Sequence, residues 1–280
     1  FLRINASIYS DMQRIWDLHK NEVHINLIVG GSVQSLIHKI FESNKEPLYN
    51  RQTAIIRVNK FPPSVLKEIL AYHNPNYTND DLLALYSFTG GVAKYVELLM
   101  DKGATTRSQM IATIVQADSV FLSEGKNLLI EEFGKDYGIY FSILTAIASG
   151  HTQRSQIEDM IGKEIGGYLT MLEDSYGIIH KHKPLFTIKN SNIHYRLNDN
   201  FLTFWFRFLF KYNHMLEIEA LDALRQIIER DYETFSGKML EQYFKEKLAE
   251  QQQFTRIDSW WSRNGESEID IIAINEIDKE

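Results

Sequence analysis

The aromatic run Phe201–Phe210, FLTFWFRFLF, constrains the fold of this chain more than any other feature. A stretch this apolar has to leave water, yet it is far shorter than the roughly 20 residues that cross a bilayer. Arg207 interrupts it and Lys211 follows it. No other apolar run reaches the length of a membrane span. We therefore expect a core helix or a seal between domains, and no membrane partner.

The composition excludes several classes of protein. Hydrophobic residues make up 44% of the 280 residues and charged residues 24%, an ordinary globular balance that argues against long disorder. The net charge of -7 provides no overall basic field, so nucleic-acid binding would have to be local. The absence of cysteine excludes disulfide scaffolds and cysteine zinc sites. With no leader in view, we expect a cytoplasmic protein and interpret both ends as cuts in a longer chain.

Residues 1–61 have the pattern of a wound α/β sheet. A helical face beginning at Ile8 precedes the unbroken apolar run Ile25–Val29, which is typical of a strand buried on both faces. Gly30, Gly31 and Ser32 then end the strand and cap the next helix. A second strand is expected at Ala54–Val58.

Residues 62–132 predict a small helical domain. Pro62 and Pro63 suit the first turn of a helix, and Asn79–Asp81 offers a cap with acidic side chains before Leu82. The pair Gly90–Gly91 interrupts the helical period.

Residues 133–200 have the order of a winged helix, three short helices followed by a hairpin. Residues 201–280 predict the aromatic helix, two further helices at about 216–228 and 236–250, and two strands at 254–261 and 268–274. The expected fold class is α+β and mostly helical.

Several segments, in this order, resemble an archaeal and bacterial family of P-loop ATPases of the AAA-like or STAND type. The resemblance covers essentially the whole chain. It implies the second half of an ATPase core, a helical lid, a winged helix, and a truncated C-terminal domain of the DUF234 type with a restriction-endonuclease-like fold. The matching pieces are LIVGGS, LYNR, VNKFPPSVLKEIL, SFTGGVAKYVELL, YRLNDNFLTFWFRFLF and WWSRNGESEIDIIAIN.

The chain also departs from this family. The phosphate-binding G-x-x-x-x-G-K-[ST] loop is absent from these residues, and so is the acidic strand end that would hold Mg²⁺. Ala93 stands where the family usually has proline. The family's next strand would follow Glu280. The resemblance therefore implies ATP and Mg²⁺ as cofactors of a full-length ATP hydrolase, with none expected in these residues alone.

The resemblance assigns nucleotide-related roles to four residues. Ser32 matches the sensor position, with a helix cap as the alternative. Arg51 matches the arginine finger, whose planar guanidinium stabilises the charge of phosphoryl transfer, with a structural arginine as the alternative. Gly90 and Gly91 would approach the adenine or ribose, unless they form only a turn.

Two further sites are expected in the C-terminal half. Lys181 and Lys183 form a basic tip on the hairpin that suits a nucleic-acid phosphate, although a protein contact is the alternative for this module. Glu241 and Asp270 match the helix glutamate and the strand aspartate of a nuclease-like site, where Asp270 would bind a metal ion and Glu268 is a nearby alternative. The alternative is that these carboxylates are solvent-exposed and have no catalytic role.

Three functions follow from this pattern. The first is a nucleotide-dependent regulatory switch that couples an ATPase core to the winged helix and the C-terminal domain. The second is a winged-helix module that binds DNA, with a vestigial ATPase. The third is a Mg²⁺-dependent nuclease. A protein partner and assembly into a homo-oligomer remain open.

Overall fold

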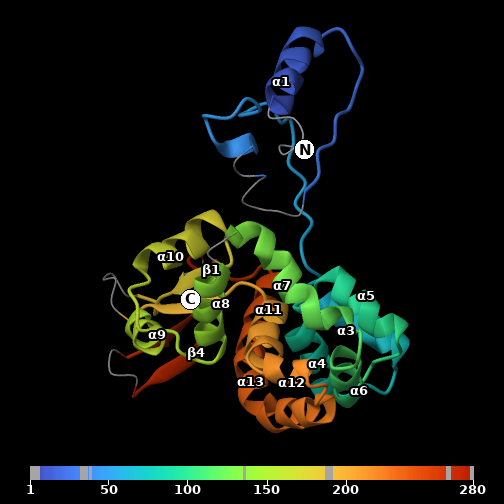
Figure 1. Ribbon diagram of the computed structural model, residues 1–280, viewed down its shortest axis with the longest axis vertical. Coiled ribbons are helices and arrows are strands. Elements are labelled where there is room, and N and C mark those ends of the chain that lie inside the picture. Colours follow the sequence, from blue (N-terminus) through green and yellow to red (C-terminus); the bar gives the residue numbers. More distant parts are fainter. Residues whose placement is uncertain are drawn as a thin grey trace. The chain divides into compact units, whose positions relative to one another are not determined.

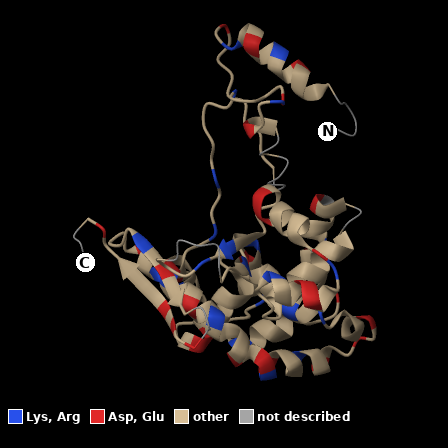
Figure 2. Cartoon of the chain, turned by 90° about the vertical axis from the view of Figure 1, so that its left-hand side faces the viewer, with Lys and Arg blue, Asp and Glu red and all other residues tan. Residues whose placement is uncertain are grey.

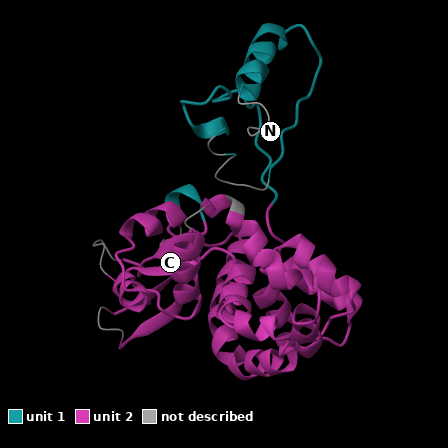
Figure 3. Cartoon of the chain, in the orientation of Figure 1, with its two compact units in different colours: residues 1–58, 174–177 teal, residues 59–173, 178–280 magenta. Residues whose placement is uncertain are grey.

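A computed structural model describes residues 7–31, 37, 40–134, 137–186, 192–262 and 266–277 of the chain. It divides into two compact units, one made of residues 1–58 with 174–177, the other of residues 59–173 with 178–280 (Figure 3). We call them unit 1 and unit 2. The four domains expected from the sequence stay predictions.

Unit 1 contains the helix α1 (Ile8–His19), where the helical face was expected. The two strands predicted at Ile25–Val29 and Ala54–Val58 are wrong: neither segment forms a strand or pairs with another strand of the described residues. Ile28 and Val58 are almost fully exposed. A strand of a buried parallel sheet needs neighbours for its hydrogen bonds, and the described part of unit 1 supplies none.

Unit 2 is mostly helical and carries two small antiparallel sheets (Figure 1). This agrees with the expected α+β, mostly helical class. Its first helices are α3 (Pro63–His73), α4 (Asn79–Thr89), α5 (Ala93–Asp101), α6 (Arg107–Ile114) and α7 (Val120–Phe133).

Three helices and a hairpin follow in the expected order. The helices are α8 (Tyr137–Ala148), α9 (Arg154–Ile161) and α10 (Gly166–Thr170), and the π-helix η2 (Met171–Ser175) continues the last of them. The strands β1 (Ile179–His182) and β2 (His194–Leu197) pair antiparallel, with Ile179 opposite Leu197 and His182 opposite His194.

The C-terminal part ends in a second hairpin. Its elements are α11 (Asn200–Phe204), η3 (Trp205–Phe210), α12 (Asn213–Glu217), α13 (Leu221–Glu250), β3 (Arg256–Trp261) and β4 (Glu268–Ile274). The sequence predicted two helices where α13 is a single one of 30 residues. Gly237 does not interrupt it, because buried side chains on both sides, among them Ile228 and Tyr243, hold the helix in place.

The aromatic run lies in the core of unit 2, as its composition required. Phe201, Phe204, Phe206 and Leu209 are fully buried. Rings from four other helices pack against the run: Tyr95 of α5 on Phe201 (ring centroids 4.1 Å apart), Phe88 of α4 on Phe204 (4.8 Å), Phe141 of α8 on Phe206 (5.3 Å) and Phe235 of α13 on Phe208 (5.4 Å). None of the described helices combines the length and apolar character that a bilayer crossing requires.

Two turns in the helical part are fixed by local chemistry. The cap of α4 is Thr78 rather than the expected Asn79, because Thr78 and Asp81 form a reciprocal capping box. After α4, Gly90 and Gly91 both adopt positive φ angles, of 57° and 78°. A β-carbon on Gly91 would lie 2.2 Å from the carbonyl oxygen of Phe61, whose amide donates to the Gly91 carbonyl at 2.7 Å.

We expect Gly91→Ala to destabilise the protein by about 3 kcal/mol, since the methyl group adds a backbone clash to the strain of a positive φ angle. Gly103→Ala is the matched control: its φ is 66° but no atom lies within 4 Å of the added β-carbon, so a loss of only about 1 kcal/mol is expected. Urea unfolding of both variants measures the difference. Equal losses of unfolding free energy in the two variants would show that the clash with Phe61 does not contribute to the effect.

Candidate functional site

A cleft of about 510 Å³ lies where the β1–β2 hairpin meets α13 and β3. The hairpin and these two elements come from the two different domains expected from the sequence, yet they lie within one compact unit. The lining residues are His180, Lys181, His182, Lys183, Pro184, Arg196, Gln242, Lys245, Glu246, Ala249, Arg256, Ile257 and Asp258.

The cleft is basic although the chain is acidic. Five lysine or arginine side chains line it, Lys181, Lys183, Arg196, Lys245 and Arg256, against the carboxylates of Glu246 and Asp258. Over the rest of unit 2, basic and acidic residues are interspersed along the helices (Figure 2). Convergence of cations from the β1–β2 hairpin, α13 and β3 therefore gives this cleft a local positive field, although the net charge of the whole chain is -7.

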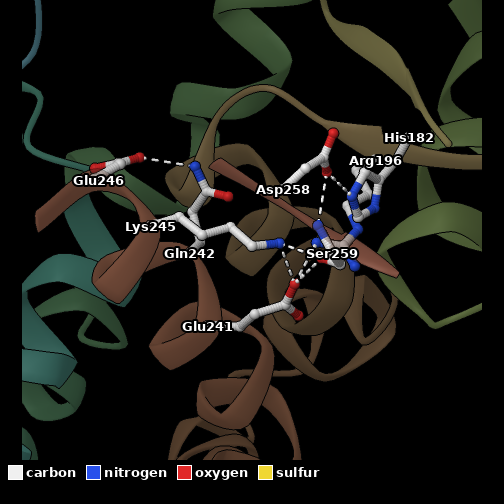
Figure 4. Close-up of polar contacts among 8 residues, drawn as sticks. All are labelled: His182, Arg196, Glu241, Gln242, Lys245, Glu246, Asp258 and Ser259. Carbon is white, nitrogen blue, oxygen red and sulfur yellow. Dashed lines mark hydrogen bonds and ion pairs between the residues drawn. The ribbon is translucent and has the colours of Figure 1, made fainter. Parts of the chain in front are cut away.

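A buried network of charged side chains forms one wall of the cleft (Figure 4). Glu241 Oε1 accepts from Lys245 Nζ at 2.5 Å and from Ser259 Oγ at 2.9 Å, and Lys245 also donates to Ser259. Arg196 of β2 reaches the same oxygen at 3.4 Å. Glu241 and Lys245 are each almost nine-tenths buried. This network joins the hairpin to α13 and β3.

The charge of Glu241 is stabilised by its partners. Burial alone would raise the pKa of this carboxyl, but Arg196 and Lys245 outweigh that effect and hold the pKa below its usual value. Glu241 is therefore ionised at neutral pH. Removing its charge would leave the partly buried cations Arg196 and Lys245 without a counter-ion. Loss of Glu241 alone should therefore destabilise the protein.

His182 forms the inner end of the cleft. Its Nε2 donates to Asp258 Oδ1 at 3.0 Å, and its ring lies against Trp261 with centroids 4.8 Å apart. Its Nδ1 is buried and has no hydrogen-bond partner among the described residues. Burial, assisted by the positive charge of Arg196, lowers the pKa of His182 to about 4. The imidazole is therefore neutral at physiological pH.

Of the residues expected to contact a nucleotide, Arg51 lies in unit 1, whereas Gly90 and Gly91 lie in unit 2. Ser32 lies outside the described residues. The Arg51 guanidinium binds the carboxylate of Asp17 through Nε and Nη2, with distances of 2.8 to 3.2 Å, and also donates to the Pro47 carbonyl oxygen at 2.8 Å. Gly90 approaches Asn200 and Gly91 approaches Phe61, so this turn contacts its own chain.

The two residues expected to form a nuclease-like site, Glu241 and Asp270, differ in burial and in their partners. Glu241 is buried and engaged by cations, whereas Asp270 on β4 is exposed and makes no ion pair or hydrogen bond within the described part of the chain. Glu268 is also exposed, at the start of β4. Across the described residues, no three acidic, histidine or cysteine side chains form a group that could hold a metal ion.

Of the two lysines expected to bind nucleic acid, both line the cleft, and Lys181 also pairs with Glu173 at 2.5 Å. Sequence reasoning missed Arg196, Lys245, Arg256 and the pair of His182 with Asp258. The i, i+4 spacing of Glu241 and Lys245 was the available signal for one contact. No pattern in the sequence could pair His182 with Asp258, 76 residues away.

The low pKa of His182 makes stability depend on pH. The folded state binds this proton only near pH 4, while an unfolded histidine binds it near pH 6.5, so the stabilisation is complete above pH 6.5 and is lost as pH falls from 6.5 to 4. We expect His182→Gln to remove about 2 kcal/mol of the stability change between pH 7 and pH 4.5. Denaturant unfolding at the two pH values measures it.

The control is His214→Gln, because His214 is exposed on α12. The pH dependence of this variant should match that of the wild type. If His182→Gln also keeps the full dependence, the buried neutral imidazole is contradicted. Nitrogen chemical shifts of the His182 ring, followed from pH 7 to pH 3.5, report the same titration directly.

Comparison with known proteins finds a family similarity for the C-terminal part of the chain. Residues 205–280 match the DUF234 family, described as archaeal and bacterial proteins of unknown function. An uncharacterized protein of Methanocaldococcus jannaschii, MJECL04, is 29% identical over 289 aligned positions, which cover 99% of this chain. The chain spans 63% of the length of that relative. No solved structure matches the chain. The segment from Trp205 onward is thus similar to a DUF234 domain, with α13, β3 and β4 inside it.

Proposed function

We propose that the cleft between the β1–β2 hairpin and the C-terminal elements binds the phosphate backbone of a nucleic acid. The observation that carries the proposal is the convergence of five basic side chains on one cleft in a chain of net charge -7. Phosphate groups are the common ligands of clustered lysine and arginine side chains. The winged-helix reading of α8 to β2 puts the cleft on the wing of such a module.

The arrangement favours an extended anion over a small apolar ligand. The walls carry guanidinium, ammonium and imidazole groups, and few apolar side chains reach the cleft. Apolar walls are typical of pockets for small organic ligands, whereas basic clefts with exposed arginine are typical of phosphate contacts. Arg256 is exposed at the start of β3, so its guanidinium is accessible to such a backbone.

A nuclease activity receives less support from the geometry than binding does. The Glu241 carboxylate is taken by Lys245, Ser259 and Arg196, which compete with any metal ion for its oxygen. We therefore interpret Glu241 as a structural anion that holds two cations at the cleft wall.

We further propose that this module is the output of an ATPase in the full-length protein. The support is the resemblance of residues 1–61 to the second half of a P-loop core and the longer chain of the archaeal relative. ATP and Mg²⁺ would bind to parts of the protein beyond the described residues. Their state would regulate the affinity of the cleft, which makes the protein a nucleotide-dependent switch.

The binding proposal predicts a salt-dependent affinity for duplex DNA that is lost with the cleft charges. In the double variant Lys183→Gln with Arg256→Gln, the slope of log K against log salt should fall by roughly two, about one for each phosphate contact removed. Fluorescence anisotropy with a labelled duplex, measured from 50 to 200 mM salt, gives this slope.

Lys67→Gln with Lys102→Gln is the matched control, since it removes the same charge from the helical part of unit 2, away from the cleft. The control should bind as the wild type does. Equal weakening by both pairs would mean that only net charge matters, and no measurable binding by the wild type would refute the proposal.

The ATPase proposal predicts a specific effect of Arg51. In a protein that carries the P-loop segment, Arg51→Lys should lower ATP hydrolysis by about 10³-fold and leave ATP binding unchanged, because an arginine finger acts on the transition state. Arg14→Lys on α1 is the control. Unchanged hydrolysis in Arg51→Lys would assign this arginine to its pair with Asp17 alone.

A further inference from the structure

The loop Asn198–Asn200, which follows β2, contacts the cleft. His180 is one of the lining residues, and its Nδ1 donates a hydrogen bond to the side-chain carbonyl oxygen Oδ1 of Asn198, 2.5 Å away. The Asn198 amide donates to the Ile178 carbonyl oxygen at 2.9 Å, which fixes the backbone of the loop beside β1. The orientation of the His180 ring in the cleft therefore depends on Asn198.

The same loop is bound from the opposite end of the sequence. The chain enters unit 2 at Asn59, and we call Asn59–Phe61 the entry segment. Lys60 Nζ donates to the Asn198 carbonyl oxygen at 2.9 Å, a contact that joins residues 138 positions apart. The next residue, Phe61, is held by its hydrogen bond to Gly91 at 2.7 Å. The entry segment is thus attached to unit 2 at two points, through Lys60 at the surface and through the backbone of Phe61 at the buried Gly91.

The rest of the loop is rigidly held. Asp199 caps α11 by accepting from the Leu202 amide at 2.9 Å, and Asn200 Nδ2 donates to the Tyr86 carbonyl oxygen of α4 at 3.3 Å. Burial raises the pKa of Asp199, and the nearby positive charge of Lys60 opposes that shift. With its centre fixed in this way, the loop can transmit a displacement of the entry segment instead of absorbing it.

We propose that Asn198 is a positioning residue for the cleft, and that Lys60 couples the entry segment to it. A movement of the chain before Asn59 would strain or break the hydrogen bond from Lys60 to Asn198. Because Asn198 also accepts from His180, the position of the His180 ring against a bound phosphate backbone would change as well. The ligand in this statement rests on the proposed function. Because coupling between two sites is reciprocal, a ligand in the cleft must in turn restrain the entry segment.

Hydrogen exchange measured by mass spectrometry tests this coupling. In the wild type, the labelled duplex should slow amide exchange both in the hairpin and in the entry segment. In Lys60→Met, binding should persist with a loss of no more than about threefold, while the protection of the entry segment by the duplex disappears. Lys67→Met on α3 is the matched control and should keep the protection in both places.

The positioning role has its own pair of variants. Asn198→Leu removes the acceptor for His180 but keeps the carbonyl oxygen for Lys60, so DNA affinity should fall about fivefold with the protection of the entry segment partly kept. Asn198→Gln keeps a neutral amide acceptor and should retain most of the affinity. A structural defect alone would not be rescued in this way, and equal loss in both variants would overturn the positioning role.

The ligand-free protein separates the two proposals. Lys60→Met should speed amide exchange of Tyr195–Asn198 severalfold without any DNA present, since the loop loses one of its anchors. Unchanged exchange there would overturn the coupling whether or not DNA binds. Faster exchange in a protein whose wild type binds no DNA would support the coupling and reject only the nucleic-acid ligand.

Discussion

Burial of the aromatic run Phe201–Phe210 is the interaction on which the rest of unit 2 depends. Its rings pack against α4, α5, α8 and α13, so one segment gathers helices from the whole unit. Each large aromatic side chain that leaves water contributes a few kcal/mol, and the pairs add edge-to-face contacts. Because β2 leads directly into α11 and α13 contacts both β3 and β4, this core also sets where the hairpin and the C-terminal strands meet.

The cleft illustrates how a local field arises in an acidic protein. Its cations come from the β1–β2 hairpin, α13 and β3, and three of them are partly compensated: Glu241 pairs with Arg196 and Lys245, and Glu173 pairs with Lys181. Two basic groups of the wall, Arg196 and Lys245, are held by a buried carboxylate, while Arg256 extends into solvent. Fixed cations provide orientation and exposed ones provide attraction, a division that suits recognition of a phosphate backbone.

Periodicity identified most of the local structure. The bounds of β4 agree with the predicted strand, and α8, α9 and the hairpin occur where three helices and a wing were expected. The predictions that failed concern features that depend on contacts with distant residues, which local periodicity does not report. Ile25–Val29 and Ala54–Val58 are apolar enough for buried strands, but a strand exists only with partners, and the described residues of unit 1 offer none. The break expected between about residues 228 and 236 does not occur either, because the buried side chains of Tyr232 and Phe235 continue the packed face of α13 through this stretch.

Composition and periodicity predicted the mostly helical class, the lack of a membrane-spanning run, the β1–β2 hairpin, two C-terminal strands, and Lys181, Lys183 and Glu241 as candidate residues. The folded structure was needed to show that the lysines of the β1–β2 hairpin share a cleft with Lys245 and Arg256, that Glu241 binds cations, and that Lys60 contacts Asn198. The difference lies in how far apart in the sequence the interacting residues are. Helix and strand periods are properties of neighbouring residues, whereas a field or an ion pair depends on distances in space between residues that the sequence separates by up to 138 positions.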